Sequence, residues 1–190
     1  MDNLLTVYAR NCSVRRIDRT LSASFLDKNH RLGSTGGRYH YGLFVARSTS
    51  SNEVHLSEGE LVAVAVFSNA RRWKRTLSSD GVSREIVHSS YEWIRYASLQ
   101  SLRVVGGMGK LLEAFINEVR PDDVMSYADA DYPDSGQSYL KLGFRSEGEC
   151  SRAGRTNIKY RLLLRSQSFP EENAGQSHTH SPSTGHNEAV

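Results

Sequence analysis

The residues most suggestive of chemistry form a glycine cluster, Gly106-Gly107-Met108-Gly109-Lys110, at the start of a predicted helix. Glycines let the backbone turn tightly and leave no side chains between its N–H groups and a ligand. The first helical turn carries unpaired N–H donors and a partial positive charge, to which a diphosphate binds. Lys110 adds a formal charge at the same end. The cluster therefore predicts a phosphate-binding site, with an ordinary tight turn as the alternative.

Two common nucleotide motifs are excluded by spacing. The pattern G-x-x-x-x-G-K-[ST] fails because Leu111 follows Lys110. The pattern G-x-G-x-x-G fails because Leu112 stands where the third glycine is required. A phosphate site here must belong to another design.

The elements that position this cluster follow from hydrophobic periodicity. Helices are predicted over residues 19–30, with Leu21, Phe25 and Leu26 on one face, over 107–120, and over 136–142, which ends at Gly143. Strands are predicted around Val14–Ile17 and over 41–46, 61–67, 92–99, 123–129 and 157–164. The segments 41–46 and 61–67 are expected to form an antiparallel hairpin with a long polar loop. This order predicts an α/β (α+β) fold, a twisted mixed sheet with helices on both faces.

The 190 residues suit one domain, predicted over 1–165, followed by a tail, 166–190, that is rich in Ser, Gly, Pro and His. The tail holds too few apolar residues to offset the entropy of ordering, so we expect it to be disordered. His178, His180 and His186 could bind a metal only weakly, and no metal site is predicted.

Charge and composition limit the class of protein. The whole chain has a net charge of +3, and the tail contains three Glu and no Lys or Arg, so residues 1–165 carry +6. That sign favours anionic partners. No stretch approaches the ~20 apolar residues of a membrane span, and the N-terminus lacks the pattern of a secretory signal. Cys12 and Cys150 are expected to be reduced thiols, so an intracellular, cytoplasmic protein without a membrane partner is predicted.

A second candidate site is a basic run with an aromatic residue inside it. Arg71, Arg72, Lys74 and Arg75 surround Trp73 in a polar excursion over residues 69–89. This composition suits phosphate contacts combined with base stacking, which makes nucleic acid a candidate partner. A solvated loop is the alternative.

The glycine cluster together with Tyr139-Leu-Lys-Leu-Gly143-Phe144 resembles the GNAT acyltransferase superfamily. The resemblance implies that the glycine-rich loop binds the pyrophosphate of acetyl-CoA, or of a similar acyl-CoA, as co-substrate. Two registers of the loop stay open, one placed on Arg103 and Gly106 and the other on Gly107 and Gly109. In either register the residues expected to contact the acyl-CoA are Ser98, Leu99, Val105, Gly106, Gly107, Met108, Gly109, Lys110 and Leu111.

The resemblance also assigns candidate catalytic residues. In the superfamily a tyrosine a few residues before a Gly-Phe pair protonates the leaving thiolate, and Tyr139 is the matching position. Its phenol suits that role, and a core aromatic is the alternative. Backbone N–H groups near Ser98 and Leu99 are expected to form an oxyanion site.

Three further residues are expected near the acceptor. Asp129 ends a strand and could orient an amine or accept its proton, or only cap the following turn. His30 could serve as a base or a substrate ligand, or be a surface histidine at a helix end. Glu92 begins the strand on which many GNAT enzymes carry a base. Strict alternation would place Trp93 and Arg95 on one face of this strand and Glu92 on the other.

Segments between residues 25 and 145 resemble, more specifically, a divergent GNAT-like group that includes the phage Mom DNA-modification proteins and small proteins linked to homing endonucleases. The segments are Asn29-His30-x-x-Gly33, Tyr41-Gly42-Leu43, Leu61-Val62-Ala63-Val64, Ile94–Ser98 and Ser126–Asp129, besides the glycine cluster (Val105–Leu111) and the Tyr139–Phe144 motif. The predicted function is transfer of an acyl group from acetyl-CoA to an amine. The alternatives are a nucleic-acid modifying or binding protein and a GNAT-fold module without catalysis.

Overall fold

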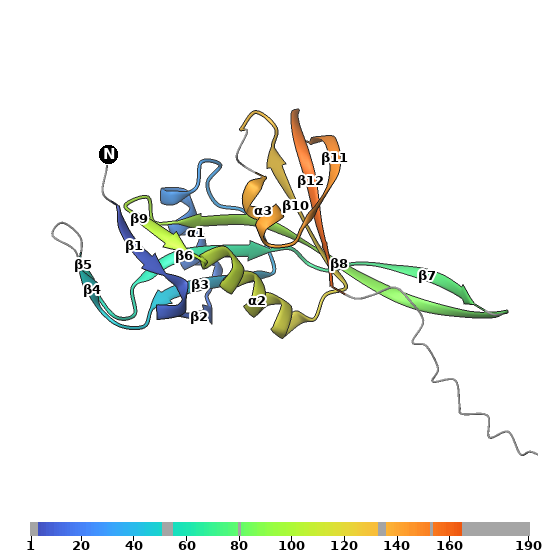
Figure 1. Cartoon of the computed structure of the whole chain (residues 1–190), viewed down its shortest axis with the longest axis horizontal. Coiled ribbons are helices and arrows are strands. Elements are labelled where there is room, and N and C mark those ends of the chain that lie inside the picture. The colour runs from blue at the N-terminus through green and yellow to red at the C-terminus, as the bar shows by residue number, and fades with distance from the viewer. Residues whose placement is uncertain (1–3, 51–54, 80, 133–135, 153, 165–190) are drawn as a thin grey trace, which may run out of the picture.

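The computed structural model describes residues 4–50, 55–79, 81–132, 136–152 and 154–164. Figure 1 shows a sheet-based body from which a long β-hairpin projects. The tail predicted to be disordered, residues 166–190, lies outside the described residues.

The main sheet is mixed and has the strand order β11-β12-β10-β8-β6-β3-β2, with β7 also paired to β8. Most neighbours are antiparallel, and β10 pairs with β8 in parallel. The strands of this sheet are β2 (Cys12–Arg16), β3 (Tyr39–Val45), β6 (Leu61–Phe67), β7 (Arg71–Ser79), β8 (Val82–Ser98), β10 (Asp123–Asp129), β11 (Arg145–Arg152) and β12 (Arg155–Leu163).

Helices cover both faces of the sheet, as predicted. On one face, α1 (Arg19–Asn29) packs Phe25 and Leu26 against Val64 and Val66 of β6. On the other face, α2 (Gly107–Val119) buries Leu111, Leu112 and Phe115 in the larger core. The Phe115 ring stacks 4.0 Å from that of Phe67. The short helix α3 (Gln137–Lys141) lies on the same side as α2 (Figure 1).

Local sequence explains where the helices begin and end. Asp18 accepts a hydrogen bond from the Leu21 N–H (2.8 Å), which satisfies an amide of the first turn of α1. Of the three apolar residues predicted on one face of this helix, Phe25 and Leu26 are buried and Leu21 is exposed. The helix α2 ends at Val119, where Arg120 adopts a left-handed conformation (φ 52°) before Pro121.

Several pairings were not predicted because they join distant or polar segments. The strand β1 (Leu5–Tyr8) pairs in parallel with β9 (Leu102–Val105), and a 3-10 turn, Ala9–Asn11, follows it. The loop between β3 and β6 contains a small hairpin, β4 (Thr49–Ser50) with β5 (His55–Leu56). The edge strand β11 has no apolar alternation in its sequence, so no period-2 pattern marks it.

The basic excursion is a β-hairpin arm formed by β7 and the first half of β8, paired from Arg71–Ser90 to Ser79–Val82. The arm extends away from the body (Figure 1). Because β8 runs unbroken from Val82 to Ser98, one strand forms both the arm and the centre of the sheet.

Candidate functional site

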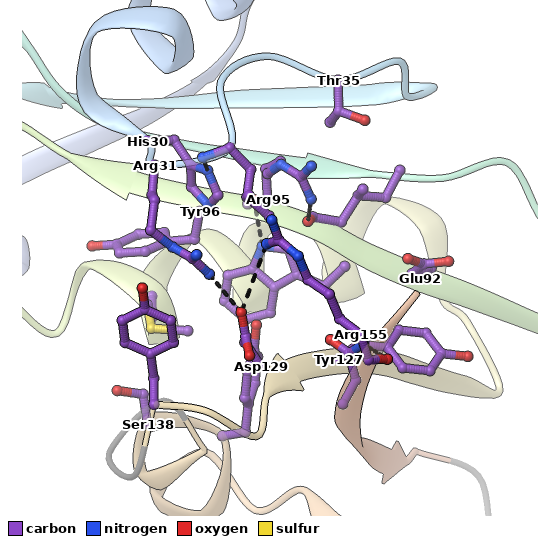
Figure 2. Close-up of a pocket in the computed structure, with 17 residues that line it drawn as sticks. His30, Arg31, Thr35, Glu92, Arg95, Tyr96, Tyr127, Asp129, Ser138 and Arg155 are labelled. Atoms are coloured by element: carbon purple, nitrogen blue, oxygen red, sulfur yellow. Dashed lines mark hydrogen bonds and ion pairs between the residues drawn. The ribbon is translucent and has the colours of Figure 1, made fainter. Parts of the chain in front are cut away.

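The principal groove lies where β8 and β10 separate. The two strands pair only from Asp123–Ser90 to Met125–Glu92. Beyond that point β8 continues beside β6 while β10 continues beside β12. The resulting opening has a volume of about 1,030 Å³ (Figure 2). Its lining comes from the segment after α1 (His30, Arg31, Leu32, Thr35), from β8 (Glu92–Tyr96), from α2 and α3 (Met108, Ser138, Tyr139) and from the β10–β12 side (Tyr127, Asp129, Tyr132, Arg155, Asn157).

A β-bulge decides which side chains of β8 lie on the α1 face of the sheet and which lie on the α2 face. Phe67 is opposite Trp93 but Val66 is opposite Arg95, so Ile94 is an extra residue. Trp93 packs with Phe67 in the α2 core, whereas Arg95 shares the α1 face with Val66. The prediction that Trp93 and Arg95 share a face is therefore wrong, because the bulge interrupts the alternation.

Beyond the bulge, β8 directs backbone groups into the groove. The Leu99 N–H donates to the Val62 carbonyl (3.0 Å), so Leu99 bonds with β6. Alternate residues of a strand direct their backbone groups to opposite edges, so Tyr96 and Ser98 direct theirs toward the groove. The Leu99 amide is thus not available as an oxyanion donor, which corrects that expectation. The Ser98 amide remains a candidate.

The glycine cluster has the geometry expected of an anion-binding turn. Gly106 precedes α2 with φ 77°, and no side chain of the described residues caps the helix. Gly107 packs closely on the sheet: a Cβ there would lie 2.8 Å from Val104 Cγ1 and 2.9 Å from the Tyr96 hydroxyl. Met108 lines the groove, so the first turn of α2 borders it. The leading amides of α2 are therefore free of capping side chains at the groove.

The other residues predicted for acyl-CoA contact differ in their surroundings. Val105 is exposed, Ser98 is half-buried and the Leu111 side chain is in the core. The Lys110 ammonium donates to the carbonyls of Ala9 (2.9 Å) and Cys12 (2.6 Å). Its charge therefore holds the N-terminal segment against α2, and contact with a phosphate would require it to leave both carbonyls.

Tyr139 lies at the groove, half-buried among aromatic rings. Its ring stacks on Tyr160 at 5.4 Å and meets Trp93 edge-on at 6.0 Å. Its hydroxyl oxygen lies 2.8 Å from Ser126 Oγ. Burial raises the pKa of the Tyr139 phenol, an effect that the hydrogen bond with Ser126 opposes. The phenol thus stays protonated at neutral pH, as a general acid must.

His30 directly follows the last residue of α1 and lines the groove. One hydrogen bond fixes which of its ring nitrogens carries the proton. Its Nδ1 accepts the Leu32 N–H (3.0 Å), so in the neutral ring the proton is on Nε2. Burial lowers the pKa of His30, and the charges of Arg95 and Arg31 lower it further. A neutral ring whose acceptor nitrogen is engaged suits a hydrogen-bond donor to a ligand better than a base.

Asp129 lies across the groove from His30 and is held by arginines (Figure 2). Its Oδ2 accepts from Arg31 at 2.8 Å and lies 3.9 Å from Arg155 Nη1. Its Oδ1 accepts the Asp131 N–H (3.1 Å), so it also caps the following turn. The bond with Arg31 is the main reason that the pKa of Asp129 is lowered. The carboxylate therefore suits a counter-ion for an ammonium group better than a proton acceptor.

Residues without an assigned role in the sequence reasoning complete the site. Ser126, almost fully buried, links Tyr139 to the Trp93 carbonyl, from which its Oγ lies 2.9 Å. Burial raises the pKa of Tyr96 to about 12. Arg31 and Arg155 reach Asp129 from separate segments. Their positions depend on the splay of the strands, for which no local sequence pattern exists.

The basic arm bears its side chains outside the groove. Arg71, Arg72, Trp73 and Lys74 are exposed, and Trp73 packs on the His88 ring at 4.4 Å. Lys74 pairs with Glu85 (3.0 Å), while Arg71 pairs with Glu92 (3.3 Å). Arg75 lies in β7. Arg71 therefore joins the arm to the groove.

The described residues hold neither a metal-binding cluster nor a membrane-spanning helix. Within the described ranges, no cluster of three or more His, Cys, Asp or Glu side chains could hold a metal ion. The tail histidines 178, 180 and 186 lie outside those ranges. No described helix has the length and apolar character needed to cross a membrane.

Comparison with solved structures identifies the fold. Arabidopsis thaliana NAA60 in complex with acetyl-CoA has a TM-score of 0.57 and 11% identity, with 80% of this chain and 99% of that chain covered. The spermidine/spermine N-acetyltransferase SpeG from Vibrio cholerae has a TM-score of 0.53 and 9% identity (82% and 94% covered). A chain of the NatC complex bound to Gag peptide and CoA has a TM-score of 0.52 and 13% identity (82% and 99% covered).

By sequence, no protein-family model and no curated protein matches the chain significantly. The structural likeness, at identities this low, shows the fold alone. The chain has a GNAT-like fold, a mixed α/β sheet with helices on both faces.

Proposed function

We propose that this protein transfers an acyl group from acetyl-CoA, or a similar acyl-CoA, to an amine. The observation that carries the proposal is the separation of β8 from β10 beside the uncapped first turn of α2. The amides of Gly107, Met108 and Gly109 would bind the pyrophosphate. The backbone groups of Tyr96 and Ser98 would bind the pantetheine arm along the edge of β8.

Residues at the two ends of the groove would supply the reacting groups. The acceptor amine enters from the side of α1, where His30, Glu92 and Asp129 lie. Asp129 is the counter-ion of the incoming ammonium, His30 donates a hydrogen bond from Nε2, and Glu92 receives the proton that frees the amine. The nitrogen then bonds to the thioester carbon, with the Ser98 amide stabilising the oxyanion. The C–S bond breaks as Tyr139 gives its proton to the thiolate, and the acylated nitrogen loses its second proton to the Tyr139 phenolate, which restores the phenol.

Titration of the full chain with acetyl-CoA in a calorimeter tests the proposal. We expect saturable one-site binding, weakened at least ~10-fold by Gly109→Val, which shields the first amides of α2. Asn117→Val, on the exposed part of the same helix, is the matched control and should bind as the wild type does. A wild-type chain that releases no heat and shows no binding by equilibrium dialysis would reject acyl-CoA use.

Activity requires a separate test, because the fold also suits a module that binds without catalysis. Thiol release from acetyl-CoA should fall by ~10²-fold or more in Tyr139→Phe, in the range of a general acid. An unchanged rate in this variant, with acetyl-CoA still bound, would remove Tyr139 from the mechanism.

A second candidate, nucleic-acid modification or binding, is favoured by the arm. Trp73 is 42% exposed between arginine and lysine side chains, as a base-stacking platform requires. Arg71 connects this surface to Glu92 in the groove, so a base amine could reach it from a strand bound on the arm. In an electrophoretic shift at low salt, Trp73→Ala should weaken binding ~10-fold and Val87→Ala, on the same arm, should not. Equal mobility with and without protein would dismiss this candidate.

A further inference from the structure

At the acceptor end of the groove, the carboxylates are buried more deeply than the arginines that pair with them. The Glu92 side chain is 6% exposed and that of Asp129 13%. The arginines that contact them are 57% exposed for Arg71, 47% for Arg31 and 52% for Arg155. Carboxylates therefore lie inside the groove and guanidinium groups surround its mouth.

Each inner carboxylate meets its outer guanidinium from the solvent side. Arg31 Nη2 lies 2.8 Å from Asp129 Oδ2, and Arg71 Nη2 lies 3.3 Å from Glu92 Oε2. Arg155 Nη1, 3.9 Å from Asp129, adds a second charge. These arginines come from three different segments, the loop after α1, the base of the arm and β12. Figure 2 shows Arg31 and Arg155 approaching Asp129 from separate segments.

The mouth is electropositive as a whole. The charged groups that line the groove are three arginines (Arg31, Arg95 and Arg155) and two carboxylates; outside the lining Arg71 adds a fourth arginine and Asp131, which acts on Arg31, a third carboxylate. Burial is the main reason that the pKa of His30 is lowered, and the charges of Arg95 and Arg31 lower it further, in keeping with a positive potential at that ring. A molecule with several positive charges is repelled here, and one that carries an anion beyond its amine is attracted.

We infer that the acceptor is an amine carried on an anionic scaffold, with a carboxylate or phosphate near the reacting nitrogen. This inference rests on the proposed acyl transfer. The ammonium group passes inward to the carboxylates, while the anion replaces those carboxylates as partner of the outer guanidinium groups. Every charge then keeps an opposite partner, whereas a polyamine would leave the arginines facing positive charge.

Matched acceptors test the inference by release of thiol from acetyl-CoA. Phosphoethanolamine is compared with ethanolamine, a peptide beginning Ala-Asp-Asp with one beginning Ala-Lys-Lys, and a short single-stranded oligonucleotide with spermidine. We expect the anionic member of each pair that reacts to have at least ~10-fold higher kcat/KM, and the preference to shrink as salt rises. Preference for spermidine or Ala-Lys-Lys, or equal rates within every pair, would overturn the inference.

The three anionic compounds also separate the sources of the anion: small molecule, peptide or nucleic acid. Arg155→Gln should reduce the preference several-fold with little change in acetyl-CoA affinity. The matched control is Arg47→Gln, an exposed arginine outside the groove lining, which should keep the preference. Retention of the full preference in Arg155→Gln would contradict the assignment of this side chain.

Binding provides a readout that does not depend on catalysis. Phosphoethanolamine should shift the ring-proton resonances of His30, and ethanolamine should shift them only at much higher concentration. If acetyl-CoA fails to bind while the anionic amine still shifts His30, the acyl-transfer proposal fails and the anionic preference stands. If acetyl-CoA binds and the two amines shift His30 equally, the inference fails and the proposal stands.

Discussion

The Ser126 hydroxyl oxygen lies 2.8 Å from the hydroxyl oxygen of Tyr139 and 2.9 Å from the carbonyl oxygen of Trp93. Ser126 Oγ is the donor in both contacts, so its single hydrogen is shared between the Tyr139 oxygen and the Trp93 carbonyl, and the hydrogen of Tyr139 stays available to the groove. Once Tyr139 has given up its proton, Ser126 can rotate its own hydrogen onto the phenolate. Ser126 is thus placed to orient the phenol and to stabilise its anion.

Replacing Ser126 with Ala should lower kcat by about 10- to 100-fold with little change in KM for acetyl-CoA, as for other groups that orient a reacting residue. The phenolate would lose a donor, so the pKa of Tyr139 should rise further. Steady-state kinetics across pH measure both effects. In the Tyr139→Phe background the Ser126→Ala change should have almost no added effect, because the two residues act as a unit. Additive losses would separate Ser126 from Tyr139.

Gly107 and Gly109 should respond differently to the same substitution. A Cβ at position 107 would overlap Val104 and the Tyr96 hydroxyl, so Gly107→Ala should destabilise the fold by about 1–3 kcal/mol. At position 109 the nearest atom is the flexible end of Leu142 at 3.3 Å, so Gly109→Ala should change stability by less than about 1 kcal/mol. Urea unfolding monitored by circular dichroism provides both values. Equal losses would show that the packing around Gly107 relaxes.

Lys110 should matter for stability more than for acyl-CoA affinity. Lys110→Met removes the charged donor from the carbonyls of Ala9 and Cys12, a loss of about 1.5–3 kcal/mol. Acetyl-CoA affinity should fall less than ~3-fold if the ammonium stays on those carbonyls. Calorimetry measures the acetyl-CoA affinity and urea unfolding measures the stability of the same variant. Lys141→Met, at an exposed position, is the control. A large loss of affinity without a loss of stability would show that Lys110 contacts the phosphate.

The stability of the fold should decrease on mild acidification because of His40. Its Nδ1 lies 2.8 Å from Ser22 Oγ and its Nε2 3.2 Å from the Gly37 carbonyl, and burial lowers its pKa. The unfolded chain therefore binds a proton that the folded chain resists. His40 makes its whole contribution to the free energy of unfolding above the ordinary histidine pKa near 6.5. That contribution is lost as the pH drops through this value. His30 contributes in the same direction.

Urea unfolding at pH 7.5 and pH 5.5 measures this dependence. His40→Gln should be less stable at pH 7.5 and should show a smaller difference between the two pH values. A wild-type chain with equal stability at both values would contradict the role of the two histidines.

Sequence reasoning succeeded where a segment carries its own pattern. The apolar periodicity of residues 107–120 predicted α2, and the apolar runs of β3 and β6 predicted their hairpin. It missed β1–β9, whose register joins Leu5 to Leu102, because nothing local specifies a pairing across so many residues. It treated the arm as a loop because two strands standing in solvent need no apolar face.

The candidate site shows the same division. The glycine turn and Tyr139 were found because each has a local signature. Ser126, Arg31 and Arg155 were not, since their proximity to the groove arises from the bulge at Ile94 and the separation of β8 from β10. One inserted residue in a strand changes which side chains meet, and the sequence of that strand contains no glycine to mark it.

The continuity of β8 has a mechanical consequence. Its seventeen residues run from the tip of the arm to the wall of the groove without a break. Because no loop separates Val82 from Glu92 and Trp93, a change in the position of the arm acts on the same strand that carries these two side chains. A molecule that binds the far end of the hairpin therefore acts on the same strand that forms one wall of the groove.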